Sequence, residues 1–565
     1  MQPSDRRLAN AIRALAMDAV EAANSGHPGM PMGMADAATA LFTRHLKFDA
    51  ADPRWPDRDR FILSAGHGSM LIYALLYLTG YERPTLDDIR RFRQLGSPTA
   101  GHPENFELAG VEVTTGPLGQ GVAMAVGMAI AERHLNAIYG DELVDHRTFV
   151  IAGDGDLMEG INHEAIGLAG NLKLGRLIVL WDDNKITIDG STDLSRNEDV
   201  VARHQAAQWH VCQCDGLNAE DVSRAIDEAI AEPRPSLIRC KTIIGFGAPN
   251  LQGTAATHGA ALGKDEVEAA RKELGLDDEE FTVPDEVLTA WRAAGKRGAI
   301  EHALWKERLE ESGRKAEFLA RLNGKVGDAW LRPYLDKLHA ELKPVATRKA
   351  SEMALEAINA AIPATIGGSA DLTGSNNTKT RALEPLTADQ YAGRYIYYGI
   401  REFGMAAAMN GMALHGGVIP YGGTFLVFTD YARPAIRLSA LQGARVVFVM
   451  THDSIGLGED GPTHQPIEHL QSLRAMPQLD VYRPADAVET AECWALALQS
   501  EGPSILALTR QNVRPVRTEP AGENLSAHGG YRLKAAENTR KIIFIATGSE
   551  VEIALDAAAE LEAQG

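Results

Sequence analysis

Residues 148–184 contain two apolar runs, Phe149-Val150-Ile151-Ala152 and Leu177-Ile178-Val179-Leu180-Trp181, each followed at once by polar residues. Continuous apolar runs of this length predict buried strands of a parallel sheet. The first run stops at Gly153-Asp154-Gly155 and the second at Asp182-Asp183-Asn184, and the interval between them leaves room for one crossover helix. We therefore predict an α/β fold with Asp154 and Asn184 at the carboxyl ends of neighbouring strands, where open parallel sheets bind ligands.

Asp154 and Asn184 have the chemistry of a divalent cation site. The carboxylate of Asp154 is a hard oxygen donor, and the glycines on either side let the backbone turn sharply and approach a ligand closely. The amide oxygen of Asn184 would be a second ligand of the same ion, and a diphosphate would fit beside it. The simpler alternative is a tight turn at Asp154 and a helix cap at Asn184, because these residue types dominate turns. The paired spacing favours the cation site.

The composition is that of a large acidic α/β protein. A chain of 565 residues exceeds one hydrophobic core, and a hydrophobic content of 45% excludes the disordered and fibrous classes. The formal net charge of −20 opposes nonspecific binding to nucleic acid or to anionic membranes, so we expect neither as a partner. An anionic substrate would therefore need positive charge that is gathered locally.

The sequence indicates neither a membrane span nor an oxidising compartment. No apolar run approaches the roughly 20 residues of a span, and the first residues lead into an amphipathic helix rather than a signal peptide. The cysteines lack CxxC or metal-binding spacing, and the first two alternate as on one face of a strand. These cysteines are Cys212, Cys214, Cys240 and Cys493. We expect a cytoplasmic protein with reduced, structural cysteines.

Four histidines lie in glycine-containing loops of the first half of the chain. His27 lies in residues 25–33, which we predict to be an irregular loop because they are rich in Gly and Pro. His67 follows a predicted strand at 61–64, and His102 and His258 lie in later loops. A single histidine of this kind is usually exposed or caps a helix. Because loops on a rigid scaffold often carry function, the four together favour a common site.

The second half of the chain repeats the α/β pattern after a helical connection. Residues 264–342 are charged, and we predict a helical link without chemistry of its own. A second unit begins near Ala346. Residues 395–405, which include Glu402, lead into a predicted helix at 406–414 that is apolar on nearly every side. We therefore expect Glu402 to be a buried carboxyl with a raised pKa, suited to passing a proton. The alternative is an ordinary first-turn glutamate favoured by the helix dipole.

Aromatic and basic residues of this second unit are further candidates. Phe425, Phe428 and Tyr431 recur at helical spacing, which is typical of a core stripe but would also let a ring stack on an aminopyrimidine. Arg348 precedes a predicted helix, and Arg510 follows a predicted strand at 504–509. A guanidinium group offers a fork for phosphate, although surface arginines would look the same in the sequence.

Residues 541–565 read as the beginning of a third unit. We predict a strand at 542–546, a capped turn and a helix at 551–563. One strand and one helix cannot bury both faces of a sheet, so we expect the natural protein to continue beyond this chain.

Taken together, these motifs resemble those of the transketolase family. The pair formed by Gly153-Asp154-Gly155 and Asn184 is similar to the motif of thiamine-diphosphate enzymes, and the resemblance covers nearly the whole chain. The matching blocks are residues 25–31, 66–69, 114–121, 153–160, 182–190, 401–405 and 451–466. Residues 253–261, around His258, depart from the family pattern.

The resemblance implies two doubly wound parallel-sheet domains that bind thiamine diphosphate, plus the start of a third, truncated α/β domain. On this basis we expect a diphosphate-binding domain with a helical tail at 1–318, a linker at 319–345, a pyrimidine-binding domain at 346–527 and the beginning of a C-terminal domain at 528–565. Two chains would form a homodimer with active sites at the interface.

The resemblance also assigns site residues. Mg²⁺, or Ca²⁺ or another divalent cation in its place, would be held by Asp154, Asn184 and the main-chain carbonyl of Ile186. The cofactor would contact His67, Gly116, Pro117, Leu118, Gly155, Asn184, His258, Glu402 and Phe428. The sugar phosphate would contact His27, His258, Arg348, Ser375, His452, Asp460, His464 and Arg510. The catalytic set would be Glu402, His27, His258, His102 and His464.

The activity implied is the reversible transfer of a two-carbon ketol unit from a ketose phosphate, such as xylulose 5-phosphate, to an aldose phosphate, such as ribose 5-phosphate or erythrose 4-phosphate, in the pentose phosphate pathway. Dihydroxyacetone synthase and a phosphoketolase-like lyase are close alternatives that differ in their acceptors. A non-enzymatic relative that keeps the fold for binding or regulation would be expected to have lost Glu402 or the pair of Asp154 and Asn184, and all three are present.

Overall fold

The structure of the chain, a computed structural model, describes residues 3–564. It divides after Lys315 into two compact units, each of which has its own parallel sheet.

The first unit is built on a five-stranded sheet in the order β1-β2-β3-β7-β6, with every neighbouring pair parallel. Its strands are β1 (Arg60–Leu63), β2 (Thr148–Gly153), β3 (Leu177–Asp183), β6 (His210–Asp215) and β7 (Ser236–Lys241). A separate antiparallel pair consists of β4 (Ile186–Thr187) and β5 (Gly190–Ser191). The two strands predicted from residues 148–184 are thus confirmed as β2 and β3, neighbours in the sheet.

Helices connect the strands of the first unit. The α-helices are α1 (Asp5–Ala23), α2 (Gly29–Ala40), α3 (Met70–Thr79), α4 (Leu86–Arg90), α5 (Gln120–Tyr139), α6 (Asp154–Met158), α7 (Gly160–Asn171), α8 (Val200–Ala206), α9 (Ala219–Ala231), α10 (Lys264–Leu274), α11 (Asp285–Gly295) and α12 (Ala299–Glu311). Shorter helices of other types are η1 (Leu41–His45), η2 (Gly66–Gly68), η3 (Thr192–Leu194) and η4 (Ala255–Thr257).

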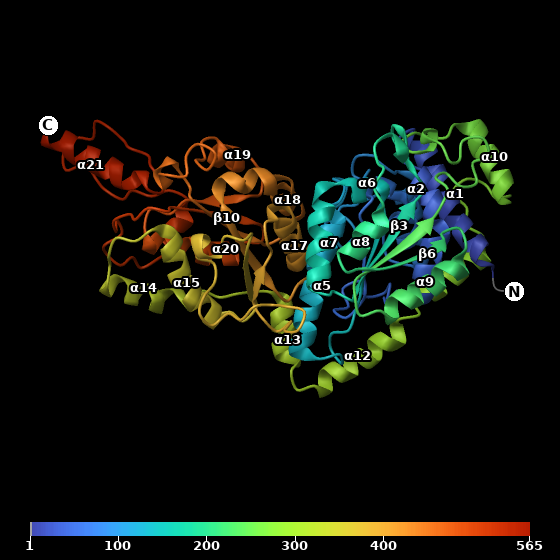
Figure 1. Cartoon of the computed structure of the whole chain (residues 1–565), viewed down its shortest axis with the longest axis horizontal. Coiled ribbons are helices and arrows are strands. Elements are labelled where there is room, and N and C mark those ends of the chain that lie inside the picture. The colour runs from blue at the N-terminus through green and yellow to red at the C-terminus, as the bar shows by residue number, and fades with distance from the viewer. Residues whose placement is uncertain (1–2, 565) are drawn as a thin grey trace. The chain divides into compact units, whose positions relative to one another are not determined.

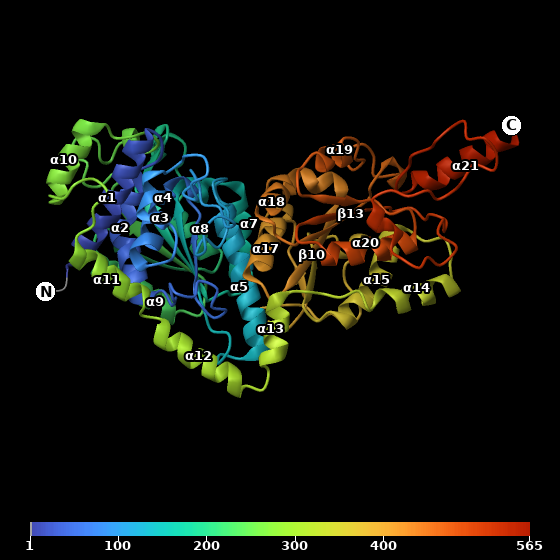
Figure 2. The same ribbon diagram turned by 180° about the vertical axis from the view of Figure 1, so that it is seen from behind.

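The central strands are buried on both faces, which is why their sequences are apolar without interruption. Phe149 and Ile151 of β2 and Ile178 and Leu180 of β3 lie on one face and pack into a core with α1, α2, α3 and α9. Helix α5 packs against β2 from the other face and is in contact with α7. Figure 1 shows α5 and α7 on one side of β3 and α1 and α2 on the other, and Figure 2 shows the same layers from behind.

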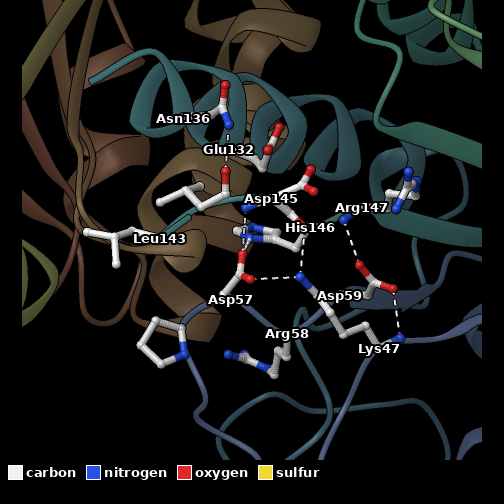
Figure 3. Close-up of polar contacts among 12 residues, drawn as sticks. Lys47, Asp57, Arg58, Asp59, Glu132, Asn136, Leu143, Asp145, His146 and Arg147 are labelled. Carbon is white, nitrogen blue, oxygen red and sulfur yellow. Dashed lines mark hydrogen bonds and ion pairs between the residues drawn. The ribbon is translucent and has the colours of Figure 1, made fainter. Parts of the chain in front are cut away.

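A buried polar cluster ties together the segments that enter β1 and β2 at their amino ends (Figure 3). Lys47 Nζ donates to Asp57 Oδ2 (2.7 Å), and His146 Nδ1 lies 3.1 Å from Asp57 Oδ1. Asp59 accepts hydrogen bonds from the main-chain N–H groups of Lys47 (2.8 Å) and Arg147 (2.7 Å). Each buried carboxylate therefore has partners, as buried charge requires. The cluster fixes the edge of the sheet opposite to the carboxyl ends of the strands.

Residues 25–33 differ from the prediction of an irregular loop. Only the segment up to Pro28 is irregular, because α2 begins at Gly29 and includes Pro31 and Gly33. Pro31 lies in the first turn, where the N–H that proline lacks has no helical partner to lose. A Cβ atom on Gly33 would lie 2.9 Å from the carbonyl oxygen of Ile243, so glycine here permits close packing rather than a break in the helix.

The second unit contains a six-stranded parallel sheet in the order β12-β13-β11-β10-β8-β9. The strands are β8 (Thr365–Ser369), β9 (Tyr395–Tyr397), β10 (Ile419–Phe425), β11 (Val447–Thr451), β12 (Asp480–Tyr482) and β13 (Ser504–Leu508). The α-helices are α13 (Lys315–Asn323), which spans the division, α14 (Leu331–Ala340), α15 (Thr347–Ala361), α16 (Thr373–Asn376), α17 (Glu402–His415), α18 (Thr429–Gln442), α19 (His469–Arg474), α20 (Ala487–Gln499) and α21 (Glu550–Ala563). Shorter turns are η5 (Leu426–Phe428), η6 (Ile455–Leu457) and η7 (Leu525–His528).

This second sheet is also covered on both faces. Tyr421 of β10 packs with residues of α15 and α20, including Leu355 and Trp494. A Cβ on the next residue, Gly422, would lie 2.7 Å from the sulfur of Met409, so α17 approaches the other face closely. Figure 1 shows α17 and α18 beside β10. The predicted strand at 504–509 is confirmed as β13 with a shifted end, and the helical character of 264–342 is confirmed by α10–α14.

The strand predicted at 542–546 is wrong for the described chain. Residues 541–547 have no regular structure, and Ile542, Ile543, Phe544 and Ile545 are exposed. A strand needs a hydrogen-bonded neighbour, and no described segment lies beside these residues as one. The helix predicted to follow is confirmed as α21.

Two further sequence expectations concern cysteines and membranes. The four cysteines are free, and Cys212 and Cys214 lie on one face of β6 and pack against the core of the first unit. Among residues 3–564, no helix combines the length and the hydropathy that a membrane crossing requires.

Candidate functional site

The four histidines of the first unit come together at the carboxyl edge of its sheet. His27 lies between α1 and α2, His67 in η2 after β1, His102 before α5, and His258 directly after η4. The ring centroid of His27 lies 5.2 Å from that of His67, 6.3 Å from that of His102 and 5.9 Å from that of His258. His67 and His258 are stacked, with centroids 5.1 Å apart.

Burial and mutual proximity keep these imidazoles neutral at physiological pH. Burial is the main cause that lowers the pKa of His67 to about 3 and that of His27 to about 4, with a smaller contribution from neighbouring histidines and, for His27, from Arg93. Burial likewise lowers the pKa of His102 and of His258. Neutral imidazoles can both donate and accept hydrogen bonds, which suits a site that handles hydroxyl and carbonyl oxygens.

Arg93 was missed by sequence reasoning. Its guanidinium group contacts His27 and the two loops beside it. Its Nη2 lies 3.3 Å from His27 Nδ1 and 3.4 Å from the carbonyl oxygen of Gly101, and its Nη1 donates to Ser25 Oγ (3.0 Å). A guanidinium has only donors, so His27 Nδ1 accepts and the proton of the neutral ring lies on Nε2. Arg93 therefore selects the tautomer in which His27 presents a donor.

Asp154 and Asn184 lie at neighbouring strand ends, as predicted. Gly153 pairs with Asp182 in the register of β2 and β3, so α6 begins at Asp154 beside the end of β3. Asp154 is buried, and its Oδ2 accepts a hydrogen bond from the main-chain N–H of Lys185 (3.2 Å). Burial raises the pKa of this carboxyl, although a neighbouring guanidinium opposes the shift. Asn184 Oδ1 accepts from the N–H of Ile186 (2.9 Å), so Asn184 and Ile186 form one compact turn.

Two buried aspartates hold the surrounding loops in place. Asp156 accepts hydrogen bonds from Ser64 Oγ (2.6 Å) and from the N–H groups of Gly119 (2.8 Å) and Gly153 (2.9 Å). Asp182 accepts from Asn184 Nδ2 (2.8 Å). These carboxylates join segments that follow β1, β2 and β3, and they fix the positions of the predicted ligands.

The residues around Asp154 fit a divalent cation with a diphosphate. The donor set offers a carboxylate, an amide oxygen and a main-chain carbonyl, the hard ligands that Mg²⁺ takes together with phosphate oxygens. Within the four-histidine cluster, His258 Nδ1 is buried and has no hydrogen-bond partner among the described residues. The loop at 116–118 crosses Gly155, where a Cβ would lie 2.8 Å from Leu118. The loop at 116–118 therefore packs against the turn that contains Asp154, a predicted cation ligand.

The second unit contains a polar pocket of about 360 Å³. Its lining includes all six residues of this unit that the family resemblance assigned to the sugar phosphate, together with Gly374 and Phe425. The six are Arg348, Ser375, His452, Asp460, His464 and Arg510. They come from α15, α16 and the loops that follow β11 and β13, and the fold brings them to one edge of the sheet.

Two arginines give this pocket its positive charge. Arg348 Nη1 donates to the carbonyl oxygen of Ser375 (2.8 Å), and Arg510 donates to the carbonyl oxygen of Leu457 (3.1 Å) and to Glu459 Oε1 (2.5 Å). Burial, followed by the charge of Arg510, lowers the pKa of Arg348. Two guanidinium groups in one pocket of an acidic protein are the local positive charge that an anionic substrate requires.

The rings of His452 and Phe425 form one wall of the same pocket. Their rings are stacked with centroids 3.7 Å apart, and burial lowers the pKa of His452 to about 4. His452 has φ of +60°, an uncommon conformation for a residue other than glycine and one that is often found at functional sites. Phe425 was considered at the sequence level only as part of an aromatic stripe. Its helical spacing did not show that it ends β10 and faces a pocket.

Glu402 and Phe428 lie near the same end of β10. Glu402 begins α17 and is half-buried, and Thr424 Oγ1 lies 3.5 Å from its Oε1. Burial raises the pKa of Glu402, in the direction predicted from its apolar helix. The ring of Phe428 is half-buried and stacks on Phe425 with centroids 5.9 Å apart.

Comparison with known proteins identifies three domains in the chain. Residues 4–327 match the family model "Transketolase, thiamine diphosphate binding domain", residues 343–516 match "Transketolase, pyrimidine binding domain", and residues 529–565 match "Transketolase-like TK C-terminal domain". The last match assigns residues 529–565 to a third domain of this family.

Curated relatives and solved structures agree with the family models. The chain is 59% identical to a transketolase of Cereibacter sphaeroides over 99% of this chain and 86% of the relative, and 58% identical to one of Rhodobacter capsulatus over 100% and 84%. It superposes with a TM-score of 0.94 on a transketolase from Leishmania mexicana, at 44% identity over 100% of this chain and 85% of that one. The same score is obtained, at 45% identity over 99% and 85%, with a Pichia stipitis transketolase in complex with sedoheptulose 7-phosphate.

Proposed function

The chain belongs to the transketolase family of thiamine-diphosphate-dependent transferases, and we propose that its residues transfer a two-carbon ketol unit from a ketose phosphate to an aldose phosphate. The observation that carries this proposal is the pocket of the second unit, in which Arg348 and Arg510 lie beside His452, His464 and polar side chains. Phosphate is the group that such a fork of guanidinium donors recognises best.

In this proposal the first unit binds the cofactor through its diphosphate. Asp154, Asn184 and the carbonyl oxygen of Ile186 hold a divalent cation, normally Mg²⁺, which neutralises the diphosphate. His67, His258, Gly155 and the loop of Gly116, Pro117 and Leu118 contact the cofactor itself. When bound, thiamine diphosphate supplies a ring that stabilises negative charge on carbon, so that the bond beside a ketose carbonyl can be broken and remade.

Glu402 and the histidines handle protons. The half-buried Glu402 carboxyl, whose pKa is raised by burial, hydrogen-bonds the pyrimidine ring of the cofactor, and Phe428 packs against that ring. His27, held by Arg93 with its proton on Nε2, donates to a substrate oxygen, and His102, His258 and His464 act on the neighbouring oxygens of the sugar. Ser375 and Asp460 bind substrate hydroxyl or phosphate oxygens in the pocket.

We further propose that the active protein is a homodimer whose sites use the first unit of one chain and the second unit of the other. The supporting observation is that the cation ligands belong to one compact unit and Glu402 to the other, each with its own core. A cytoplasmic location is also proposed, and the free cysteines support it because reduced thiols persist there. Cell fractionation would test the location.

The activity is tested by product formation. Protein with Mg²⁺ and thiamine diphosphate should convert xylulose 5-phosphate and ribose 5-phosphate into a seven-carbon ketose phosphate and a triose phosphate. If protein shown to have bound the cofactor forms no such product, the proposal fails. Replacing the acceptor by formaldehyde or by inorganic phosphate tells ketol transfer between sugars apart from the two related activities.

A further inference from the structure

Arg196 lies in the loop between η3 and α8 and makes direct contact with the proposed cation ligand. Its Nη2 is 2.9 Å from Asp154 Oδ1, which also accepts a hydrogen bond from Trp181 Nε1 (3.0 Å). The guanidinium lies over the Trp181 ring, with Cζ 5.6 Å from the ring centroid. Nothing in the sequence pattern singled out this residue.

The Arg196 guanidinium is held in place by Asp154, but not all of its hydrogen-bond donors have acceptors. The Arg196 side chain is 10% exposed, and the side chain of Asp154 is 2% exposed. Arg196 Nη1 is buried and has no hydrogen-bond partner among the described residues. A buried donor without an acceptor is uncommon and costs free energy, which points to a ligand that supplies the missing acceptor.

The location of Arg196 has opposite consequences for the two components of the cofactor complex. A divalent cation that binds Asp154 brings positive charge next to a buried guanidinium, and the two repel each other. A diphosphate brings negative oxygens that can accept from the free Nη1 donor, and hydrogen bonds of this charged kind are strong. The same side chain therefore opposes the cation and favours the anion.

We propose that Arg196 makes the binding of the divalent cation at Asp154 conditional on the diphosphate. It competes with a cation that arrives alone, and it donates to the diphosphate when the cation and the diphosphate bind together. This inference rests on the proposed function, because it takes Asp154 as a cation ligand. It adds a residue to the cofactor site and gives it a defined role in the coupling between cation and cofactor.

The test measures binding rather than turnover. Calorimetric titrations of Mg²⁺ alone, of Ca²⁺ alone, and of thiamine diphosphate at saturating Mg²⁺ are made on cofactor-free wild-type protein and on Arg196→Gln. In Arg196→Gln the affinity for either cation alone should rise about tenfold, and the affinity for thiamine diphosphate should fall about tenfold, within the range of typical coupling between two ligands. Inorganic diphosphate with Mg²⁺ should show the same loss.

Arg239 provides a matched control. Its guanidinium also lies over Trp181, with Cζ 5.3 Å from the ring centroid, but its Nε pairs with Asp183 Oδ2 (2.6 Å) rather than with Asp154. Arg239→Gln also removes one guanidinium group from the face of the Trp181 ring. In this variant the affinity for the cation alone should change less than threefold. Arg196→Lys keeps the positive charge but lacks the paired N–H donors of the guanidinium group. Because the charge still repels the cation, the cation alone should still bind weakly to this variant.

The outcomes separate this inference from the proposed function. If wild-type protein does not bind thiamine diphosphate with Mg²⁺, the proposed function fails. If the wild-type protein binds it but Arg196→Gln has unchanged affinities, or if Arg239→Gln changes them equally, only the role of Arg196 is overturned. Should Arg196→Gln not fold, as judged by circular dichroism, Arg196→Lys decides the question, since tight binding of cation alone to that variant contradicts the proposal.

Discussion

At the scale of single residues, the Glu402 carboxyl has the environment that a proton-transfer group needs. It is half-buried at the first position of α17, and burial raises its pKa. Glu402→Ala should lower turnover by about 10²–10⁴-fold, the usual contribution of a positioned acid or base. Steady-state assays with saturating cofactor measure this loss.

The control for this variant is its assembly. Sedimentation of Glu402→Ala should show the same oligomer as the wild-type protein, because the side chain contributes little to either hydrophobic core. Turnover close to that of the wild type in a correctly assembled variant would overturn the assignment of Glu402.

The histidine cluster makes the stability of the cofactor-free protein depend on pH. The pKa of His67 in the folded protein is about 3 against an ordinary value of 6.5, so the unfolded chain binds the additional proton between these pH values. The contribution of His67 to stability is therefore complete above about pH 6.5 and is lost as the pH falls toward 3, at up to about 1.4 kcal/mol per pH unit. Between pH 7 and pH 5, His67→Gln should lose about 2 kcal/mol less stability than the wild type.

Urea unfolding of the wild type and of His67→Gln at pH 7 and pH 5 measures the unfolding free energies. The loss between the two pH values is calculated for each protein separately and then compared. Equal losses of stability in His67→Gln and in the wild type would show that this histidine is not held neutral by the fold.

The residues that sequence reasoning missed have no local pattern to reveal them. The four histidines could be grouped because each lies in a glycine-containing loop, and Arg348 and Arg510 could be named as candidates because they lie next to predicted elements. Arg93 and Arg196 are single charged residues in loops, and only the fold shows that one contacts His27 and the other Asp154. Their roles depend on contacts between distant segments, which composition and periodicity do not encode.

At the scale of elements, the central strands were predictable because burial on both faces leaves a continuous apolar run. Helix α2 could not be predicted, because its glycines indicate a loop when the packing around them is unknown. Gly29 begins this helix, and a Cβ there would lie 2.5 Å from the carbonyl oxygen of Thr257, next to His258. The glycine is thus a packing requirement between α2 and the loop that carries a site histidine.

Gly29→Ala should consequently disturb both stability and the site. The added methyl group has to displace the main chain at Thr257, which should lower the unfolding free energy by about 1–3 kcal/mol, as overpacking commonly does. The affinity for thiamine diphosphate should fall with it because His258 moves. Thermal unfolding and calorimetry measure the two effects.

Gly160, at the start of α7, is the matched control. A Cβ there would meet no atom within 4 Å, so Gly160→Ala should leave stability unchanged or slightly higher. If Gly29→Ala were equally harmless, the close approach of α2 to this loop would be contradicted.

The segment at 542–546 shows the limit of prediction at this scale. Its apolar residues have strand character, but a strand exists only beside a partner, and the described chain provides none. Periodicity indicates what a segment can form and does not show whether its neighbour is present.

At the scale of the whole molecule, the proposed homodimer makes a quantitative prediction. Asp154→Ala and Glu402→Ala should each be inactive as pure homodimers. If each site takes Asp154 from one chain and Glu402 from the other, a mixed dimer of the two variants contains one intact site and one doubly altered site. Dissociating and reassembling an equal mixture should therefore restore about a quarter of wild-type activity, since half of the dimers are mixed.

Mixtures that are never dissociated serve as the control and should remain inactive. A reassembled mixture that stays inactive, in a sample shown by native mass spectrometry to contain mixed dimers, would place both residues of each site in the same chain.

The central claim is that Asp154 and Asn184 anchor thiamine diphosphate through a divalent cation, and calorimetric titration of the cofactor with and without Mg²⁺ tests it most directly. Wild-type protein stripped of metal by a chelator should bind thiamine diphosphate only after Mg²⁺ is restored, and Asp154→Ala should fail to bind it in either condition. Binding that is equally strong without any divalent cation, or undiminished binding by Asp154→Ala, would contradict the account.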